Sequence, residues 1–237
     1  MNKLIFKQKG ITLIELLVAL VILAFVVGGT YRIFVAQSKA YTVQDQVADI
    51  QQNIRSTMEI LVRDLRMTGF DPDEMPLISL SSPPLGINFN GDNSLRILYQ
   101  NGNDIRTVEY WRDGASNLNR LQYTNGVPDP GQADSVLLRN VETLNLTYGV
   151  DGTESLEESQ DGSIDDVNAD NIINDQDFVS GATVTAGNLK AIAVLVTLTA
   201  RPEALRAEGT NEDIQRMVSP RTLTSTVTFR NRCLIKR

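Results

Sequence analysis

The feature that most constrains this chain is an apolar segment near its N-terminus, KGITLIELLVALVILAFVVGGTYR at residues 9–32, which contains one carboxylate. Leu16 to Val27 carries no polar side chain, and residues 11–31 in a helix can cross a bilayer of about 30 Å. Glu15 is the exception, because a charge in hydrocarbon costs roughly 2.5–3.5 kcal/mol on insertion scales and is usually retained for a function. The segment therefore predicts a membrane helix in which Glu15 has a role.

Two simpler interpretations explain only part of this segment. Residues 1–10, MNKLIFKQKG, are basic and contain no acid, which predicts that this end stays in the cytoplasm. An ordinary signal peptide cleaved after Ser38-Lys39-Ala40 is one alternative, although the apolar run is long for such a signal and Glu15 would serve no purpose in it. A plain anchor helix is the other alternative, and it leaves Glu15 unexplained.

The residues around Glu15 resemble a known export signal. Gly10 followed by ITLIELLVAL closely resembles the class III signal of type IV prepilins and type II secretion pseudopilins. The resemblance implies that a prepilin peptidase cleaves between Gly10 and Ile11 and methylates the new N-terminus, although many pilins have Phe where Ile11 stands. Because an unpaired buried charge is costly, the Glu15 carboxylate is expected to pair with the terminal amine of a neighbouring subunit. Glu15 is therefore the predicted assembly residue.

The sequence after the apolar run predicts that the helix continues. Apolar residues recur every three or four positions, at Val47, Ile50, Ile54, Met58, Leu61 and Leu65. Gly69 supplies a C-cap and Pro72 follows it, so we expect one helix over about 11–68 with Gly28-Gly29 as its weakest point. The apolar stripe is where a globular head should pack.

The remainder of the chain predicts β-structure. Six segments are rich in β-branched, aromatic and leucine residues, at Leu95–Tyr99, Ile105–Trp111, Leu118–Thr124, Val136–Tyr148, Ala191–Ala200 and Leu223–Phe229. Asn101-Gly102 and Asp113-Gly114 mark hairpins or tight turns. Residues 70–94 are expected to form a loop-rich connection, and residues 201–221 a long charged excursion between two strands.

The head also resembles a family. MEILVRDLRMTGFDP at 58–72, NVETLNLTYGVDG at 140–152, LKAIAVLVTLTAR at 189–201 and RTLTSTVTFRNR at 221–232 resemble minor pilins of the PilW type. The J-type pseudopilins of type II secretion have a similar layout. The resemblance implies an α+β, pilin-like fold, in which a long N-terminal helix, transmembrane in its first half, packs on an antiparallel β-sheet head.

The same resemblance implies an organisation and a set of partners. The expected parts are a leader peptide at 1–10, a transmembrane and filament-core helix at 11–31, its amphipathic continuation at 32–68, and a β-rich head at 69–237 with an acidic loop at 149–188. The implied partners are other major and minor pilins, the prepilin peptidase/methyltransferase and the inner-membrane assembly platform. The implied location is the bacterial inner membrane, single-pass with the head in the periplasm, and then an extracellular pilus or a periplasmic pseudopilus.

The acidity of the chain is concentrated in one segment. Residues 149–177 hold ten acidic residues and no Lys or Arg. Within them, DVNADNIINDQD at 166–177 has the spacing of an EF-hand loop and resembles the calcium loops of dockerins. The predicted Ca²⁺ ligands at positions 1, 3, 5, 7, 9 and 12 are Asp166, Asn168, Asp170, the Ile172 carbonyl, Asn174 and Asp177.

Two further residues of this loop carry expectations. Asn171 replaces the usual glycine at position 6 and must tolerate a positive φ, which Asn does better than most residues. Ile173 is expected to be a buried apolar pin. The alternative is that the segment is a solvated acidic loop that binds no metal.

Composition argues for a structural protein. The chain has no His, its one Cys is Cys233, and no nucleophile–base pair or phosphate loop is evident. A net charge of −7 argues against nucleic-acid binding, although local basic patches leave DNA uptake as a third possibility. The sequence therefore predicts a minor pilin that helps to initiate or assemble a type IV pilus and is not an enzyme. The alternatives are a J-type pseudopilin and a calcium-dependent tip adhesin on a pilin stem.

Overall fold

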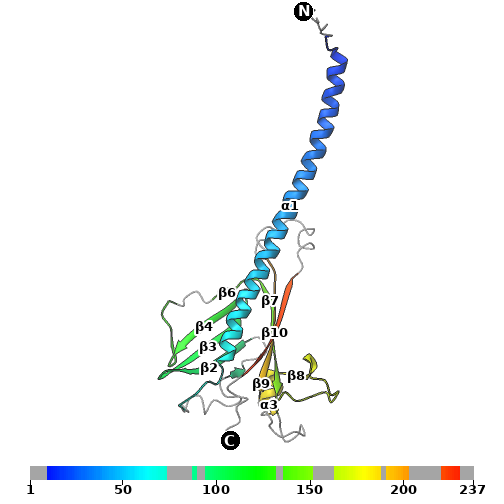
Figure 1. Cartoon of the computed structure of the whole chain (residues 1–237). Helices are drawn as coiled ribbons and strands as arrows, with labels where there is room; N and C mark the ends of the chain where they lie inside the picture. The colour runs from blue at the N-terminus through cyan, green and yellow to red at the C-terminus, as the bar shows by residue number, and fades with distance from the viewer. Residues whose placement is uncertain are drawn as a thin grey trace, which may run out of the picture. The chain divides into compact units, whose positions relative to one another are not determined.

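The structure is a computed structural model that describes residues 10–73, 87–89, 94–131, 136–151, 163–187, 191–202 and 220–229. The chain divides into two compact units, Met1–Asp45 and Gln46–Arg237. The division falls within helix α1 (Leu13–Arg66), which is coloured blue to cyan in Figure 1. The predicted helix over about 11–68 is therefore confirmed, and it passes through Gly28 and Gly29 without a break.

The first unit consists of the N-terminal part of α1. The hydroxyl of Thr12 accepts a hydrogen bond from the Glu15 backbone N–H at 3.4 Å, which caps the first turn. Every side chain from Gly10 to Phe34 is exposed, including the whole apolar run. Within the described part of the chain, α1 is the one helix that is long and apolar enough to cross a membrane.

The second unit contains two antiparallel sheets. The first sheet has the order β1 (Ile87–Phe89), β2 (Ser94–Asn101), β3 (Asp104–Arg112), β4 (Leu118–Thr124) and β5 (Val127–Pro128), with β6 (Val136–Leu138) also paired to β4. The second sheet has the order β10 (Arg221–Thr228), β9 (Ala191–Ala200), β7 (Val141–Val150) and β8 (Phe178–Ser180). The 3₁₀ turn η1 (Asp175–Asp177) precedes β8, and the short helix α3 (Gly181–Gly187) follows it. The predicted α+β class is confirmed.

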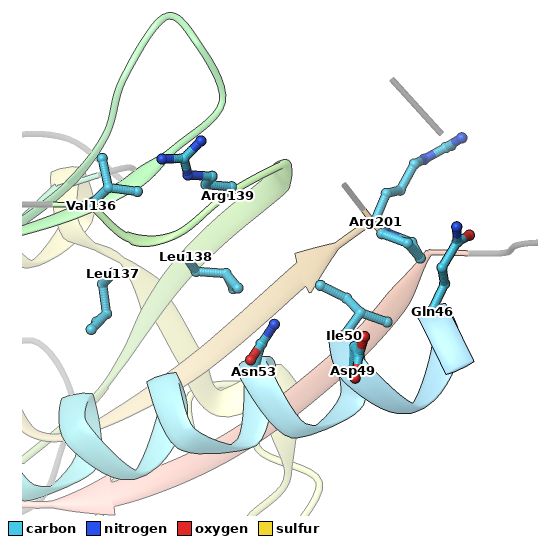
Figure 2. A pocket seen from close by; sticks show the side chains of 10 residues that line it. Gln46, Asp49, Ile50, Asn53, Val136, Leu137, Leu138, Arg139 and Arg201 are labelled. Atoms are coloured by element: carbon cyan, nitrogen blue, oxygen red, sulfur yellow. The ribbon is translucent and has the colours of Figure 1, made fainter. Parts of the chain in front are cut away.

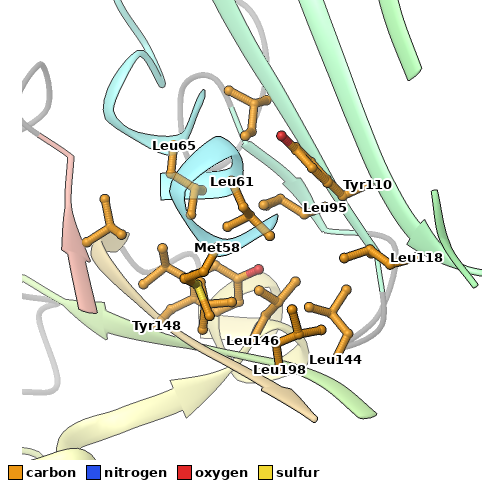
Figure 3. Packing of buried hydrophobic residues seen from close by; sticks show 14 of the residues in the cluster. Met58, Leu61, Leu65, Leu95, Tyr110, Leu118, Leu144, Leu146, Tyr148 and Leu198 are labelled. Carbon is orange, nitrogen blue, oxygen red and sulfur yellow. The ribbon is translucent and has the colours of Figure 1, made fainter. Parts of the chain in front are cut away.

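The C-terminal half of α1 lies between these sheets. Met58, Leu61 and Leu65 project from the helix into a cluster that includes Leu95 and Tyr110 of the first sheet and Leu146, Tyr148 and Leu198 of the second, as Figure 3 shows. The predicted apolar stripe is thus buried from Ile50 to Leu65, while Val47 is half-buried. Burial of a large apolar side chain contributes about 1.5–3 kcal/mol, so this stripe fixes the helix in the head.

The end of α1 is also as predicted. Gly69 has a φ of 68°, in the left-handed region that favours glycine at a helix C-cap. Its backbone N–H donates to the Leu98 carbonyl of β2 at 3.0 Å. The chain therefore turns directly from the helix onto the first sheet.

One predicted strand is wrong. The segment Val136–Tyr148 forms two strands, β6 and β7, which belong to different sheets. Asn140 lies between them with a φ of 54°, a conformation that Asn adopts more readily than most residues and that interrupts an extended strand. The strand-forming residues on both sides of Asn140 hid this crossing from one sheet to the other.

Other elements were not predicted, or lie outside the described residues. The short strands β1, β5 and β8 were not expected, because two or three residues give no readable period. The seven-residue helix α3 was not expected either. Leader residues 1–9, Cys233, residues 152–162 and most of the loops predicted at 70–94 and 201–221 lie outside the described part of the chain.

Candidate functional site

The predicted processing site lies just before helix α1. Gly10 and Ile11 precede the first helical residue, Leu13, and the Ile11 side chain is 77% exposed. A peptide bond outside a helix can adopt the extended form that a protease needs, and no folded element of the described chain covers this one. The arrangement is compatible with cleavage between Gly10 and Ile11, which stays a prediction.

Residue 15 takes part in the start of the helix through its backbone, because its N–H donates to the Thr12 hydroxyl. Thr12 and Glu15 have the spacing of a capping box, in which the first residue caps the helix and the acid lies three residues later. A carboxylate in the first turn also interacts favourably with the helix dipole. Among the described residues, no hydrogen bond or ion pair to the Glu15 carboxylate is present. The pairing of this carboxylate with another subunit stays a prediction.

The predicted calcium loop has part of the expected form. Asp166 Oδ1 and Asn168 Oδ1 both accept the Asp170 N–H, at 3.2 and 3.0 Å, and Asp166 Oδ2 accepts the Asn171 N–H at 2.5 Å. Asn171 has a φ of 62°, as the position-6 prediction requires. The first half of the loop thus curls around the side-chain oxygens of Asp166, Asn168 and Asp170.

The second half of the loop holds Asp177 in another role. Asp177 is fully buried, and its carboxylate accepts the N–H groups of Val167 at 3.1 Å and Asn174 at 2.7 Å. Asn174 in turn caps η1 by accepting the Gln176 N–H. Within the described residues, no three Asp, Glu, Cys or His side chains are grouped closely enough to hold a metal ion. The structure therefore gathers Asp166, Asn168 and Asp170, and Asp177 meets this half of the loop at its backbone, where it also accepts the Asn168 N–H at 3.5 Å.

The expectation for Ile173 is wrong. Ile172 and Ile173 are 62% and 51% exposed, so neither is a buried pin. The loop folds around its polar side chains rather than around an apolar anchor. It therefore presents two adjacent isoleucines beside the exposed carboxylates Asp170 and Asp175.

A buried polar network at the end of α1 was missed altogether. Asp64 is only 5% exposed, and its Oδ2 accepts hydrogen bonds from the Tyr110 hydroxyl at 2.6 Å and from Arg120 Nε at 2.8 Å. Tyr110 and Arg120 are paired across β3 and β4, and the Arg120 guanidinium lies 6.0 Å from the Tyr110 ring centroid. Burial, and then the nearby Asp64 carboxylate, raise the pKa of Tyr110. The network ties the helix to the first sheet.

A signal for this network was present in the sequence. Thr57, Asp64 and Thr68 are buried polar residues on the face of the apolar stripe, at spacings of seven and four. A polar residue at a position that should be buried indicates a partner, because burying a carboxylate without one is costly. The identity of the partners, Tyr110 and Arg120, could not be read from that spacing.

A cavity of about 390 Å³ opens beside the first turns of the helix within the second unit. Figure 2 shows Asn53 of α1 near Leu138, with Arg201 and Gln46 at the other end. Among the described residues, its lining contains one carboxylate and two guanidinium groups but no Ser, Thr, Cys, Lys or His. This lining offers no pairing of a nucleophile with a base.

Comparisons with known proteins point to one kind of protein. Residues 5–31 match the prokaryotic N-terminal methylation motif. The pilin-like protein PilA3 of Thermus thermophilus is 30% identical over 121 residues, which are 49% of this chain and 48% of that protein. The chain thus matches about half the length of that curated relative. These two similarities support a type IV pilin-like protein.

One solved structure was also found to be similar. A type IV-like pilin from Thermus thermophilus aligns with 77% of this chain and 98% of its own, at 12% sequence identity and a TM-score of 0.41.

Proposed function

We propose that this chain is a minor pilin: a structural subunit that is anchored in the inner membrane, cleaved between Gly10 and Ile11, and then built into a type IV filament. One observation carries the proposal. The methylation motif at residues 5–31 coincides with the start of α1, where the apolar side chains are exposed and Glu15 occupies the first turn. An apolar helix of this kind suits a bilayer first and the core of a filament afterwards.

The described residues favour a packing role over a chemical one. Two buried acidic residues of the head make structural contacts. Asp64 accepts hydrogen bonds from Arg120 and Tyr110, and Asp177 accepts hydrogen bonds from backbone N–H groups. Other pilins, the prepilin peptidase and the assembly platform are the partners that this function requires. Within the pilins, the PilW type is the assignment that the segments at 58–72 and 189–201 favour.

Processing of the full-length protein in its own host tests the proposal. We expect N-terminal sequencing of the membrane form to begin at Ile11, and intact mass to show one added methyl group. Gly10→Val should remain uncleaved, whereas Gly28→Ala should be processed normally, because a Cβ at Gly28 meets no atom within 4 Å. A mature chain beginning at Tyr41 would show that the segment is an ordinary signal peptide.

The phenotype of a deletion separates the pilus from its main alternative. If the chain is a minor pilin, its deletion should cause loss or shortening of surface filaments. Retained surface filaments together with loss of secreted hydrolases would instead assign the chain to the J-type pseudopilins.

We also propose that the loop at 166–177 binds Ca²⁺, as a module for adhesion or for stabilising the head. The supporting observations are the convergence of Asp166 and Asn168 on one backbone N–H and the positive φ of Asn171. Asp177 must leave its capping position to complete the six-ligand set.

A further inference from the structure

An apolar groove with a basic rim lies between α1 and the edge strand β10. Its floor is formed by Met58, Val62, Met67 and Leu223, and its volume is about 630 Å³. This is a size that suits a few side chains of a binding partner. We call it the α1/β10 groove. It lies wholly within the second unit.

The rim of the α1/β10 groove is positively charged. Arg55, Arg63 and Arg66 of α1 line it together with one acid, Glu59. All four side chains are exposed, so the rim carries a net charge of about +2 around an apolar floor. The occupant that fits such a surface is a short segment with exposed apolar side chains and carboxylates beside them.

This chain carries such a segment in the loop at 166–177. Ile172 and Ile173 are both more than half exposed and lie between the exposed carboxylates Asp170 and Asp175. No Lys or Arg occurs between residues 149 and 177. These two isoleucines give an otherwise polar loop exposed apolar side chains that a partner surface could bury.

The loop cannot reach the groove of its own chain. It leads into β8, which is one edge of the four-stranded sheet, whereas β10, which lines the groove, is the opposite edge. Figure 1 labels both strands. Three strand spacings, about 14 Å, separate these edges. The loop is also fixed at both ends. At its start the Asp165 N–H donates to the Val150 carbonyl, and at its end Asp177 is buried. The contact must therefore join two molecules.

We propose that the α1/β10 groove binds the loop at 166–177 of a second copy of this chain, with Ile172 and Ile173 on the apolar floor and Asp170 and Asp175 against the arginine rim. Because groove and loop occupy opposite edges of one sheet, the contact is head-to-tail. Such contacts leave a free groove and a free loop at the two ends and so continue into a row of subunits. The proposal concerns the folded head alone and does not depend on processing at Gly10.

Disulfide trapping of the full-length chain in mild detergent tests the contact. Cys233→Ser removes the native thiol, and Ile173→Cys and Thr224→Cys are then placed in separate preparations, since Thr224 is an exposed residue of the groove. Mixing them under oxidising conditions in chelator should give a dimer that links 173 to 224. A matched pair, Val127→Cys with Thr224→Cys, controls for random collision, because Val127 is 66% exposed but lies in the other sheet.

Charge reversal tests the rim. Arg55→Glu together with Arg66→Glu in the groove partner should lower the yield of the 173–224 dimer by roughly tenfold, since attraction becomes repulsion at two exposed positions. Adding Asp175→Lys to the loop partner should restore part of that yield. One chain that carries both Ile173→Cys and Thr224→Cys should form a ladder of oligomers rather than a closed monomer.

The proposal is overturned if the 173–224 pair links no better than the 127–224 control. It is also overturned if the yield does not respond to reversal of the rim charges, or if the double-cysteine chain closes on itself. The proposal is likewise overturned if the groove cysteine captures a different protein and no link forms between copies.

Discussion

At the scale of single residues, Asp64 shows how the helix is held in place. It is a buried carboxylate whose partners lie 46 and 56 positions along the chain, at Tyr110 and Arg120. A buried ion pair contributes little net free energy relative to apolar packing, but it is costly to break from one side. The network therefore selects one orientation of α1 on the first sheet more than it adds stability.

Asp64→Ala should lower the free energy of unfolding by about 3–5 kcal/mol, because it leaves the Arg120 guanidinium half-buried without its partner. Urea unfolding of the full chain in detergent, followed by fluorescence of Trp111, the one tryptophan, measures the change. Arg63→Ala is the matched control, since Arg63 lies 3.5 Å from the same carboxylate but is mostly exposed, and it should cost less than about 1 kcal/mol. Equal effects of the two variants would contradict this account.

Tyr110 predicts a change in stability at alkaline pH. Burial, and then the Asp64 carboxylate, raise the pKa of Tyr110 above its ordinary value of 10.0. The folded state therefore holds the proton more tightly than the unfolded chain, so this contribution is complete below about pH 10 and is lost as the pH rises further. Tyr110→Phe should reduce the decline of unfolding free energy above about pH 10, whereas Tyr41→Phe, at an exposed site, should not. An unchanged decline in Tyr110→Phe would show that other groups cause it.

At the scale of elements, the sequence pattern predicted the helix and strands that depend on neighbouring residues. The helix and five of the six β segments follow from periodicity and from turn residues such as Gly69 and Gly102, whose positive φ values the chain needs. The crossing at Asn140 could not be predicted, because the choice between two sheets depends on distant strands. The same limit hid the partners of Asp64 and the exposure of Ile173, since both depend on what packs nearby.

The acidic loop gives a prediction at this scale. Without a bound cation Asp166 and Asp170 repel each other, so Ca²⁺ that binds the folded loop must stabilise the head, by about 2.7 kcal/mol at a hundred times its Kd. The full chain in detergent should melt higher in calcium than in chelator. Asp166→Ala with Asp170→Ala should remove the difference, and Asp175→Ala, at the outward position 10, should retain it.

Calorimetric titration of the same proteins completes that test. No heat on adding calcium and no shift in melting temperature would show that the dockerin-like spacing is coincidental. In that case Asp177 would keep its capping role and the segment would be an acidic loop that binds no calcium.

At the scale of the whole molecule, the chain joins two parts with different surroundings. The first unit exposes its apolar side chains, and the second buries a core between two sheets. Side chains exposed to this extent need lipid or other apolar helices around them, which the proposed anchor and filament-core roles would supply in turn. The role of Glu15 belongs to this scale, because its proposed partner is in another subunit.

Substitutions at two neighbouring positions separate the proposed charge pairing from helix capping. Glu15→Gln keeps the size of the side chain and removes its charge, whereas Thr12→Ala removes the observed cap and keeps the charge. Expressed at native level, both variants should be cleaved and inserted. We expect Glu15→Gln to be depleted from sheared filaments, because the terminal amine of the next subunit would then be buried without a counter-charge. Thr12→Ala should be incorporated normally. Normal incorporation of Glu15→Gln would remove the pairing argument, and equal depletion of both variants would assign the effect to the start of the helix instead.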